Sequence, residues 1–516
     1  MMRISKDHLL ESFLCPETNL YQPIMKNYRT IDLKAIAWHV MEKYGFTPRF
    51  PQPVVKEVSA IHERTFTEDQ HDAGDLRTLL WSSIDNHDSM DLDQLEYCER
   101  GPNGEIRVKV AIADVDVYVK IQSETDQHAA HNGTSVYTGI EIFPMLPDRL
   151  SRGITSLLPG YDRIAVVIEY AVLLDGSFRP GDVYRALVCN KAKLVYEEVG
   201  DWLEGTSAMP RKVLEVPGLE EQIHLQNEAS QLLRKHRREQ GALELDTIEA
   251  EAVVEDGTVR GLVVKRQNLA RCVIEEFMVA ANGTMVAFLG NAGVSMIQRV
   301  VRIPKNWEGI VLTAATYGEN LPSEPDAKAL AKFLIRQKEA DPERFPDLSL
   351  TVIKLLGPGE YMMLEPGTPP TGHFALAVID YTHATAPNRR YVDVINQRLV
   401  KSILDKKTIP YQKEELSDNA AYLTDREKGA KKVQRFMRKA AAAVLLHHRI
   451  GESFDALVTG ASEKGTYVRL ITPPAEGRVM RGEQGLTVGM KVRVRLLTTD
   501  PYNGFIDFEC IGRGRS

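Results

Sequence analysis

The sequence predicts an α+β protein built from three parts: a small, mainly helical N-terminal module, a mixed α/β central domain and a C-terminal β-barrel. The chain has 516 residues, which is too many for one ordinary hydrophobic core. Patterns typical of strands and of helices alternate over residues 76–450. Residues 451–516 change to an alternation of apolar and polar residues that is typical of a small barrel.

The N-terminal module is expected over residues 1–75. Its clearest element is a helix over residues 32–46, "DLKAIAWHVMEKYGF", in which Asp32 is placed as the cap and apolar residues recur at helical spacing. The next stretch, "TPRFPQPVV", is expected to end this helix, because proline removes a backbone donor. We predict a small helical module that is similar to a helix-turn-helix.

The two larger parts have clearer elements. In the central domain, strands are predicted over residues 106–119 and 163–174, where apolar residues dominate. A helix is predicted over residues 218–242, since acidic residues begin it, basic residues end it and Gly241 follows as a stop. In the C-terminal segment, residues 491–510 alternate on both sides of Asn503-Gly504, which predicts a hairpin inside the barrel.

The composition excludes several classes of protein. With 43% hydrophobic and 26% charged residues, the chain has the composition of a soluble globular protein. The longest apolar run, residues 440–446, is far too short to span a membrane, and the N-terminus lacks the pattern of a secretory signal. Five scattered cysteines without a CxxC pair predict reduced thiols, no zinc site and a cytoplasmic location.

One segment is unusually acidic. Residues 81–97, "WSSIDNHDSMDLDQLEY", hold four aspartates and one glutamate but no lysine or arginine. Two carboxylates about 4 Å apart repel each other by about 4 kcal/mol at an effective dielectric constant of about 20. A solvated acidic loop is the usual interpretation of such a run. Here apolar residues such as Ile84 and Leu95 lie between the acids, which favours a partly buried segment that binds a cation.

The ligand types indicate which cation this would be. A calcium-binding EF-hand loop that began at Asp91 would need glycine at its sixth position, where this chain has Glu96. Carboxylate oxygens with spare coordination positions suit Mg²⁺ or Mn²⁺, which retain water and commonly bind a phosphate as well. We therefore predict a Mg²⁺ site at which Mn²⁺ could substitute.

The acidic segment resembles the "TIDxxDxxDxDDA" signature of the ribonuclease II / ribonuclease R (RNB) family of exoribonucleases. Five further segments are similar to motifs of this family and follow in the family's order. They are "VAIADVDVYV", "GTSVYTGIEIFPMLPDRLSRGITSLLPGYDRIAV", "REQGALELD", "VIEEFMVAAN" and "GHFALAVIDYTHATAPNRRYVDVINQRLV". The resemblance implies an RNB catalytic domain over residues 76–450 and an S1-type OB fold over residues 451–516.

The resemblance also implies an activity. Members of this family hydrolyse RNA processively from the 3′ end and release nucleoside 5′-monophosphates. Single-stranded RNA with a free 3′ end is therefore the implied partner, and no nucleotide cofactor is expected. The second interpretation is an RNA-binding protein on a catalytically weakened nuclease scaffold, because the chain departs from the family at two places described below.

The metal site is the first of these departures. The residues that match the metal-site acids of the family are Asp85, Asp91 and Asp93, and we also assign Asp93 to catalysis. The family usually has a fourth aspartate where this chain has Gln94, whose amide oxygen is a ligand without charge. His87 and Asp88 are expected to be solvated.

Two arginines in "ATAPNRRY" align with the family motif whose first arginine contacts the scissile phosphate. We assign Arg389 to this contact, with Arg390 as the second choice, because a guanidinium is a fixed and always charged fork for phosphate oxygens. Asp393 is expected to orient one of them. His383 and Thr385, in the same motif, are expected to be structural.

Aromatic residues complete the expected RNA site. Tyr137 matches the family tyrosine that stacks on the 3′-terminal nucleotide, and Tyr196 matches a tyrosine implicated in ribose recognition. The second departure is in residues 293–302, near the family's other stacking aromatic, where this chain has no Phe, Tyr or Trp.

Two further regions are expected to face RNA. Residues 426–449 hold eight Lys or Arg against one Glu, a formal charge of +7 in a chain of net charge −7. In the barrel, the aromatic residues that could serve either as base platforms or as core are Phe454, Tyr467 and Phe505.

Overall fold

The computed structural model describes residues 31–62, 74–248, 250–255, 258–264, 266–369, 371–462 and 465–513. The residues from Leu33 onward form one compact unit. The expected domain boundaries near residues 75 and 450 therefore stay predictions. Residues 1–30 and 63–73 of the expected N-terminal module lie outside the described part of the chain.

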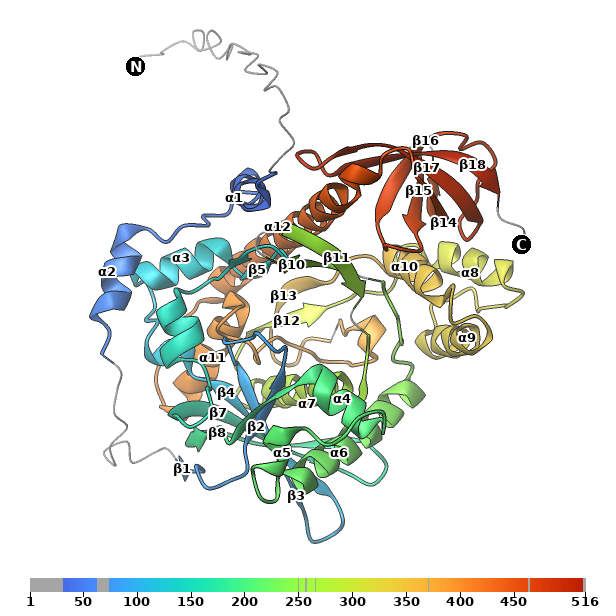
Figure 1. Cartoon of the computed structure of the whole chain (residues 1–516). Helices are drawn as coiled ribbons and strands as arrows, with labels where there is room; N and C mark the ends of the chain where they lie inside the picture. Colours follow the sequence, from blue (N-terminus) through green and yellow to red (C-terminus); the bar gives the residue numbers. More distant parts are fainter. Residues whose placement is uncertain are drawn as a thin grey trace, which may run out of the picture. The chain divides into compact units, whose positions relative to one another are not determined.

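Two helices form the described part of that module. Helix α1 (Leu33–Lys43) confirms the helix predicted around residues 32–46, and it packs on the long helix α12 (Lys413–Leu446). Helix α2 (Gln52–Ala60) packs on α3 (Glu124–Asn132) (Figure 1). Helix α1 already ends at Lys43, before the proline-rich stretch, and Gly45 follows it with a φ of 76°. Helix α2, which was not predicted, begins inside that stretch with a proline in its first turn, where no backbone donor is needed.

A seven-stranded mixed sheet forms the centre of the fold, in the order β1-β8-β7-β4-β3-β2-β9. Its outermost pairs, β1 with β8 and β2 with β9, are parallel, and the inner neighbours are antiparallel. The strands are β1 (Gly74–Asp75), β2 (Ser82–Asp85), β3 (Gln94–Arg100), β4 (Ile106–Ala113), β7 (Asp162–Val172), β8 (Phe178–Cys189) and β9 (Ala192–Val195).

Strand β7 confirms the strand predicted over residues 163–174, but β4 covers only the first part of the one predicted over residues 106–119. The chain leaves the sheet after Ala113, and the next carboxylates, of Asp114 and Asp116, bind Lys401. The mixture of strands and covering helices confirms the predicted α/β class of this region.

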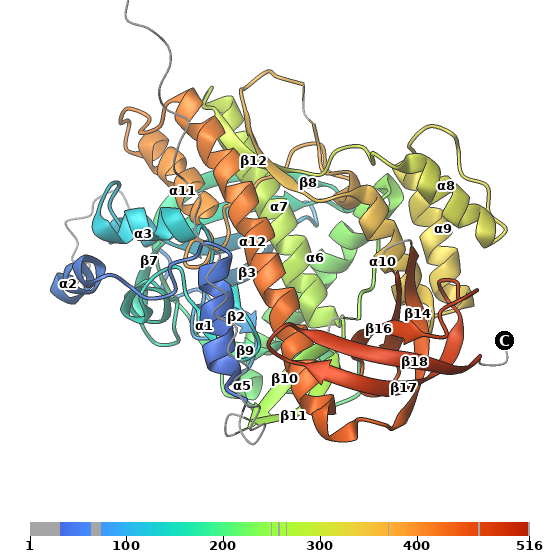
Figure 2. The same cartoon turned by 90° about the horizontal axis from the view of Figure 1, so that it is seen from above.

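Helices α6 (Leu219–Gln240) and α7 (Leu269–Asn291) pack on one face of the sheet, and α11 (Tyr391–Leu404) packs on α7 (Figure 2). They share one hydrophobic core with strand residues such as Val110. Helix α6 confirms the helix predicted over residues 218–242. It ends at Gly241, whose φ of 100° is readily adopted only by glycine.

Among the described residues, only α7 has the length and hydropathy of a membrane-spanning helix. However, 72% of its apolar window is buried inside the protein. Phe277, Ala281 and Met285 on this helix all lie in the hydrophobic core. Such burial is typical of the central helix of a globular fold.

Smaller elements surround the sheet. The helices α4 and α5 follow β9, and α8, α9 and α10 lie between β12 and β13 and enclose a hydrophobic cluster of their own around Phe333. The short strands form the antiparallel pairs β5–β6, β10–β11 and β12–β13. The bounds are β5 (Val136–Tyr137), β6 (Ile142–Phe143), α4 (Tyr196–Leu203), α5 (Arg211–Leu214), β10 (Ala250–Glu255), β11 (Thr258–Val264), β12 (Met296–Val300), α8 (Trp307–Thr316), α9 (Ala327–Ala340), α10 (Phe345–Leu356) and β13 (Glu360–Leu364).

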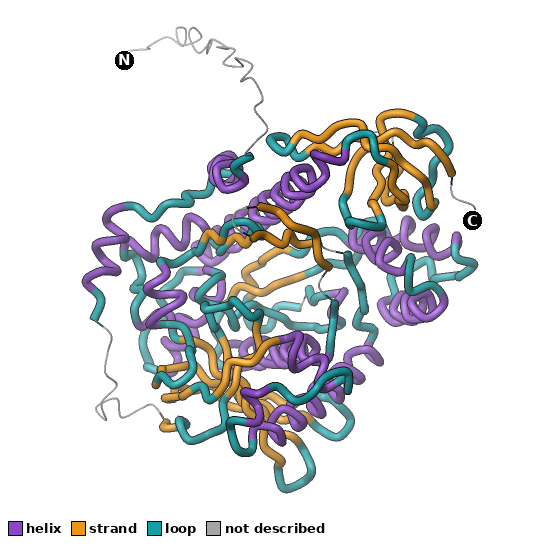
Figure 3. The backbone as a smooth tube through the Cα atoms, viewed as in Figure 1, coloured by secondary structure: helices purple, strands orange, loops and turns teal. Residues whose placement is uncertain are grey.

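The C-terminal segment forms a closed barrel in the order β14-β15-β16-β18-β17, which confirms the predicted barrel (Figure 3). Strands β17 and β18 form the hairpin predicted around Asn503-Gly504. The end of α12 contributes Ala442, Ala443 and Leu446 to the core of the barrel. The strands are β14 (Ser453–Ser462), β15 (Gly465–Leu470), β16 (Glu476–Arg481), β17 (Lys491–Asp500) and β18 (Phe505–Arg513).

Candidate active site

Three loops that are far apart in the sequence meet at one end of the central sheet. The first is the acidic loop between β2 and β3, the second leads into β5, and the third leads into α11. Backbone contacts join the second loop to the third: the amide of Ser135 donates to the carbonyl of Arg389 (2.9 Å), and the amide of Tyr391 donates to the carbonyl of Gly133 (2.9 Å). These contacts fix the predicted tyrosine and arginines beside the acids.

Asp93 is the most buried of the predicted metal-site acids, with 1% of its surface exposed. One carboxylate oxygen accepts the backbone amide of Asn388 (2.8 Å), and the other accepts Nε of Arg389 (3.1 Å). Burial raises the pKa of Asp93 to about 7. The charge of Arg389 and the amide of Asn388 oppose this rise, while the nearby carboxylates of Asp91 and Asp393 add to it.

Asp91 lies beside Tyr137, whose hydroxyl donates to its carboxylate at 2.5 Å. Burial and then the charge of Asp91 raise the pKa of Tyr137, so the hydroxyl keeps its proton and serves as a donor. The structure thus places Tyr137 at the acids, within the part of the site where the sequence predicts the end of the RNA. Its stacking on a base stays a prediction.

Asp85 lies at the end of β2, where one of its oxygens accepts the amide of Asn86 (2.7 Å) and the hydroxyl of Ser89 (2.7 Å). Lys193, on the neighbouring strand β9, donates to the carbonyls of His87 (2.8 Å) and Ser89 (2.5 Å) and so braces the acidic loop. The cations that the acidic segment lacks therefore come from distant parts of the chain, and Lys193 was not predicted.

His87 and Asp88 are exposed, as expected. The ammonium group of Lys193 binds backbone carbonyls of the loop that contains them, so the side chains of His87 and Asp88 stay at the surface.

The two predicted arginines have different surroundings. Arg390 is held by Asp393 (2.7 Å), which also accepts the amide of Ala386 (2.8 Å), so the expectation that Asp393 orients one of the arginines is met for Arg390. Arg389 keeps 45% of its side-chain surface exposed. Since Asp93 engages only its Nε, the remaining guanidinium donors are available to a ligand. Arg389 is therefore the better placed of the two for a phosphate.

The other residues of this motif are structural, as expected. Nδ1 of His383 lies 2.8 Å from the hydroxyl of Tyr361, and the hydroxyl of Thr385 accepts the side-chain amide of Asn282 at 3.4 Å.

Tyr196 begins helix α4 and follows β9, the strand that pairs with β2. The guanidinium of Arg271 lies over its ring at 4.3 Å, and its carbonyl accepts the side chain of Asn268 at 2.9 Å. Burial and then the charges of Asp85 and Glu96 raise the pKa of Tyr196. Tyr196 thus lies close to the acids, and its contact with a ribose stays a prediction.

Two alternate positions on β3, Gln94 and Glu96, are buried and polar. Gln94 is 6% exposed, and Glu96 is fully buried. Neither carboxylate oxygen of Glu96 has a hydrogen-bond partner. Burial and then the charge of Asp85 raise the pKa of Glu96 well above its ordinary value. Glu96 was not predicted, because an acid in a strand is usually taken for a surface residue unless its burial is known.

The donor chemistry of these acids fits a hard divalent cation. Among the described residues, no three His, Cys, Asp or Glu side chains are gathered closely enough to form a ready metal site. Asp91 and Asp93 are engaged by Tyr137 and Arg389, and each carboxylate has further lone pairs that can accept a cation. The residues that would hold Mg²⁺ are Asp85, Asp91 and Asp93, with Gln94 beside them.

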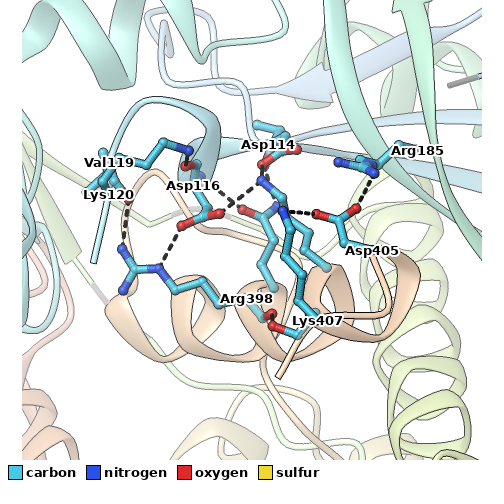
Figure 4. A network of polar contacts seen from close by, with 12 residues as sticks. Asp114, Asp116, Val119, Lys120, Arg185, Arg398, Asp405 and Lys407 are labelled. Atoms are coloured by element: carbon cyan, nitrogen blue, oxygen red, sulfur yellow. Dashed lines mark hydrogen bonds and ion pairs between the residues drawn. The ribbon is translucent and has the colours of Figure 1, made fainter. Parts of the chain in front are cut away.

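A buried network of ion pairs joins α11 to the end of β4 (Figure 4). Arg398, whose side chain is 2% exposed, donates to Asp116 (2.8 Å) and to Asp126 (2.7 Å). Lys401 binds Asp114 (2.7 Å) and also Asp116 (3.0 Å). Because the two site arginines directly precede α11, this network fixes the position of the phosphate-binding candidates relative to the sheet.

Arg398→Met should destabilise the protein by about 3–5 kcal/mol, because it leaves Asp126 as a buried carboxylate without its cation and removes one of the two cations that bind Asp116. The measurement is the urea concentration at half-unfolding, with the slope of the transition. Arg211→Met is the matched control, since Arg211 also pairs with a carboxylate but has a side chain that is 90% exposed, and it should change little. Equal effects of both variants would contradict a stabilising role for the network.

The expected RNA-facing surfaces are only partly free. On α12, Arg426 lies over the ring of Phe46 (4.0 Å) and helps to pack α1, whereas Lys428, Lys431 and Arg435 are exposed. An RNA-facing role for these exposed residues stays a prediction.

The barrel aromatics divide between core and surface. Phe505 is 60% exposed and Tyr467 is 37% exposed, so both present a ring to solvent. Of the two alternatives left open for Phe454, the core is confirmed, because the alternation of β14 turns it into the barrel core, where it is 5% exposed.

Family comparisons agree with the described architecture. The model of the RNB domain matches residues 73–406, and that of the RNase II-type exonuclease C-terminal S1 domain matches residues 452–510, which form the barrel. Ribonuclease R of Aquifex aeolicus is 30% identical over 470 residues, which cover 90% of this chain and 63% of that protein. The chain therefore spans less than two thirds of the length of this relative.

Solved structures share the fold. Mycoplasma genitalium RNase R in complex with double-stranded RNA has a TM-score of 0.80 and 25% identity, over 93% of this chain and 83% of that chain. Its complex with ribose methylated single-stranded RNA has a TM-score of 0.83 and 24% identity, over 93% and 78% of the two chains. Yeast Ssd1, described as a pseudonuclease, has a TM-score of 0.69 and 16% identity, over 90% and 58%. The fold alone thus accommodates both nucleases and a pseudonuclease.

Proposed function

This chain belongs to the RNB family, and on that premise we propose that it is a processive, hydrolytic 3′-to-5′ exoribonuclease that releases nucleoside 5′-monophosphates. The proposed substrate is single-stranded RNA with a free 3′ end, and the proposed cofactor is Mg²⁺, for which Mn²⁺ could substitute. We also propose a cytoplasmic location. The observation that carries the proposal is the direct contact of Asp93 with Arg389, which brings the predicted acid and the predicted phosphate contact to one point.

The chemistry assigns a task to each group. Bound Mg²⁺ would supply an activated water and neutralise the developing charge of the phosphate. Arg389 contacts the non-bridging oxygens of the scissile phosphate through its free donors. Arg390 forms an ion pair with Asp393, which holds the loop before α11, and adds positive charge to the site. Tyr137 and Tyr196 hold the terminal nucleotide, through base stacking and ribose contact respectively.

The competing function is RNA binding without cleavage, and two departures from the family favour it. The fourth acid of the family signature is absent here, since Gln94 carries no charge, and residues 293–302 hold no Phe, Tyr or Trp. The three aspartates and Arg389 all remain, which favours the enzyme.

A cleavage assay separates the two functions. With Mg²⁺, 5′-labelled single-stranded RNA should shorten progressively from its 3′ end, and 3′-labelled RNA should release only labelled mononucleotide. Added EDTA should stop the reaction, and omitting inorganic phosphate should not. RNA that is bound but stays intact with both Mg²⁺ and Mn²⁺ would overturn the enzymatic proposal in favour of a binding scaffold. Labelled products longer than a mononucleotide from the 3′-labelled RNA would show internal cleavage and would overturn the exonuclease mode.

A further inference from the structure

Glu96 is a buried carboxylate that the proposed mechanism does not use. None of its surface is exposed, and neither of its oxygens has a hydrogen-bond partner. Burying an ionised carboxylate without a partner is strongly unfavourable, and even the protonated form needs a hydrogen-bond acceptor. No group of the described polypeptide satisfies this side chain, so both oxygens are open to a cation or to a water bound to it.

Other oxygens around Glu96 are unsatisfied as well. Ser82 lies directly opposite Glu96 on strand β2, and the side-chain amide of Gln226 donates to the carbonyl of Glu96 at 3.4 Å. The hydroxyl of Ser82 and the side-chain oxygen of Gln226 are both buried and without partners. The surroundings of Glu96 are thus rich in oxygen atoms, the donors that hard cations and their bound waters prefer.

Glu96 and Gln94 lie on the same face of β3. Their partners on β4 are Val110 for Glu96 and Ile112 for Gln94, and both partners belong to the core beneath α6 and α7. Leu95, between them, belongs to the separate core on the other face. Alternate residues of a strand are about 6.6 Å apart, and a glutamate side chain covers part of that distance.

The charge pattern connects the two positions. Where the family signature has a fourth aspartate this chain has neutral Gln94, and two residues further on the same face it has a buried acid. Asp85 ends β2, the strand on which Ser82 lies opposite Glu96, so the two carboxylates belong to neighbouring strands. Counted together with Glu96, the three predicted metal-site aspartates make four acids at this end of the sheet.

We propose that Glu96 is the fourth acid of the divalent-cation site and supplies, directly or through a cation-bound water, the negative charge that Gln94 lacks. This inference rests on the proposed metal-dependent function. It assigns a ligand role to a residue of this chain at a position that the family signature leaves outside its acids. It also explains why a buried carboxylate is kept without a protein partner.

The test measures binding of Mn²⁺ to the full chain without RNA, by the loss of the free Mn²⁺ electron paramagnetic resonance signal, and repeats it in competition with Mg²⁺. Glu96→Gln should weaken Mn²⁺ binding by about 10-fold or more, the scale for losing a group that supports a metal site. The double variant Gln94→Asp with Glu96→Gln returns the charge to the signature position and should restore binding to near the wild-type value.

Controls separate this inference from the proposed function. Glu99→Gln, on the opposite face of β3 and partly exposed, should leave Mn²⁺ binding unchanged. Asp85→Asn should abolish it if these acids form a metal site at all. Wild-type affinity in Glu96→Gln, together with loss in Asp85→Asn, would overturn the inference and leave the proposed function standing. Unchanged binding in both variants would instead refute the metal site itself.

Folding is checked by thermal unfolding of each variant in EDTA, where no cation contributes. Glu96→Gln should unfold at or above the wild-type temperature, because a neutral amide is less costly to bury than a carboxylate. If the single variant does not fold, the folded double variant still decides the question. Its Mn²⁺ affinity near that of wild type supports the inference, and an affinity as weak as that of Asp85→Asn overturns it.

Discussion

Asp93→Asn is expected to reduce the rate of RNA cleavage by about 10³-fold, the scale for losing a group that acts on the developing charge, while RNA affinity stays nearly unchanged. The asparagine keeps the size of the side chain and can still accept the amide of Asn388. It removes the charge that engages Arg389 and that a Mg²⁺ ion would require. Arg389 is half-exposed, so solvent can satisfy its guanidinium in the variant.

The rate is measured in single-turnover experiments with enzyme in excess over 5′-labelled RNA, and affinity is measured separately in EDTA. Asp88→Asn is the matched control, because Asp88 lies in the same acidic loop but is exposed and contacts no other site residue among the described contacts. It should cleave at the wild-type rate. Wild-type turnover by Asp93→Asn would show that the assignment of the acids is wrong.

Much of the fold could be predicted, because local patterns determine local structure. The alternation on both sides of Asn503-Gly504 predicted the β17–β18 hairpin correctly, and the charge gradient ending in Gly241 predicted α6. These signals act within a few residues. Helix α2 escaped prediction because a stretch with three prolines is usually taken for a break, although a proline in the first turn is compatible with a helix.

The identity of the site residues could also be predicted, but their contacts could not. Asp93 and Arg389 lie 296 positions apart in the chain, so no local pattern links them. They meet because the third loop is anchored to the loop before β5 by backbone hydrogen bonds and to the sheet by Arg398 and Lys401.

Burial is the property that the sequence concealed most. Glu96 and Phe454 both lie in strands, and only the three-dimensional register shows that the acid faces a core and that the aromatic ring fills one. Lys193 escaped notice because it reaches the acidic loop through the parallel pairing of β2 with β9, which joins segments about a hundred residues apart. An acidic stretch without local cations is therefore weak evidence that it lacks cations in the fold.

Arg389→Lys is expected to lower the cleavage rate by about 10²-fold or more while changing RNA affinity far less. Lysine keeps the positive charge, so long-range attraction for RNA remains. It loses the planar fork, however, and one ammonium group cannot contact Asp93 and two phosphate oxygens in the same arrangement. The loss should therefore fall on the transition state, in which the phosphate oxygens gain charge.

The comparison variant is Arg390→Lys, at the neighbouring position that Asp393 holds. The Arg390 side chain is 23% exposed, against 45% for Arg389, so Arg390 is less available to a ligand and its replacement should affect the rate less. The measurements are the single-turnover rate at saturating enzyme and the RNA dissociation constant in EDTA. A larger loss of rate in Arg390→Lys would transfer the phosphate contact to Arg390. Unchanged turnover with weakened binding in Arg389→Lys would reduce Arg389 to a general contact with the RNA backbone, because an interaction made equally in the ground state and the transition state changes affinity and leaves the chemical step untouched.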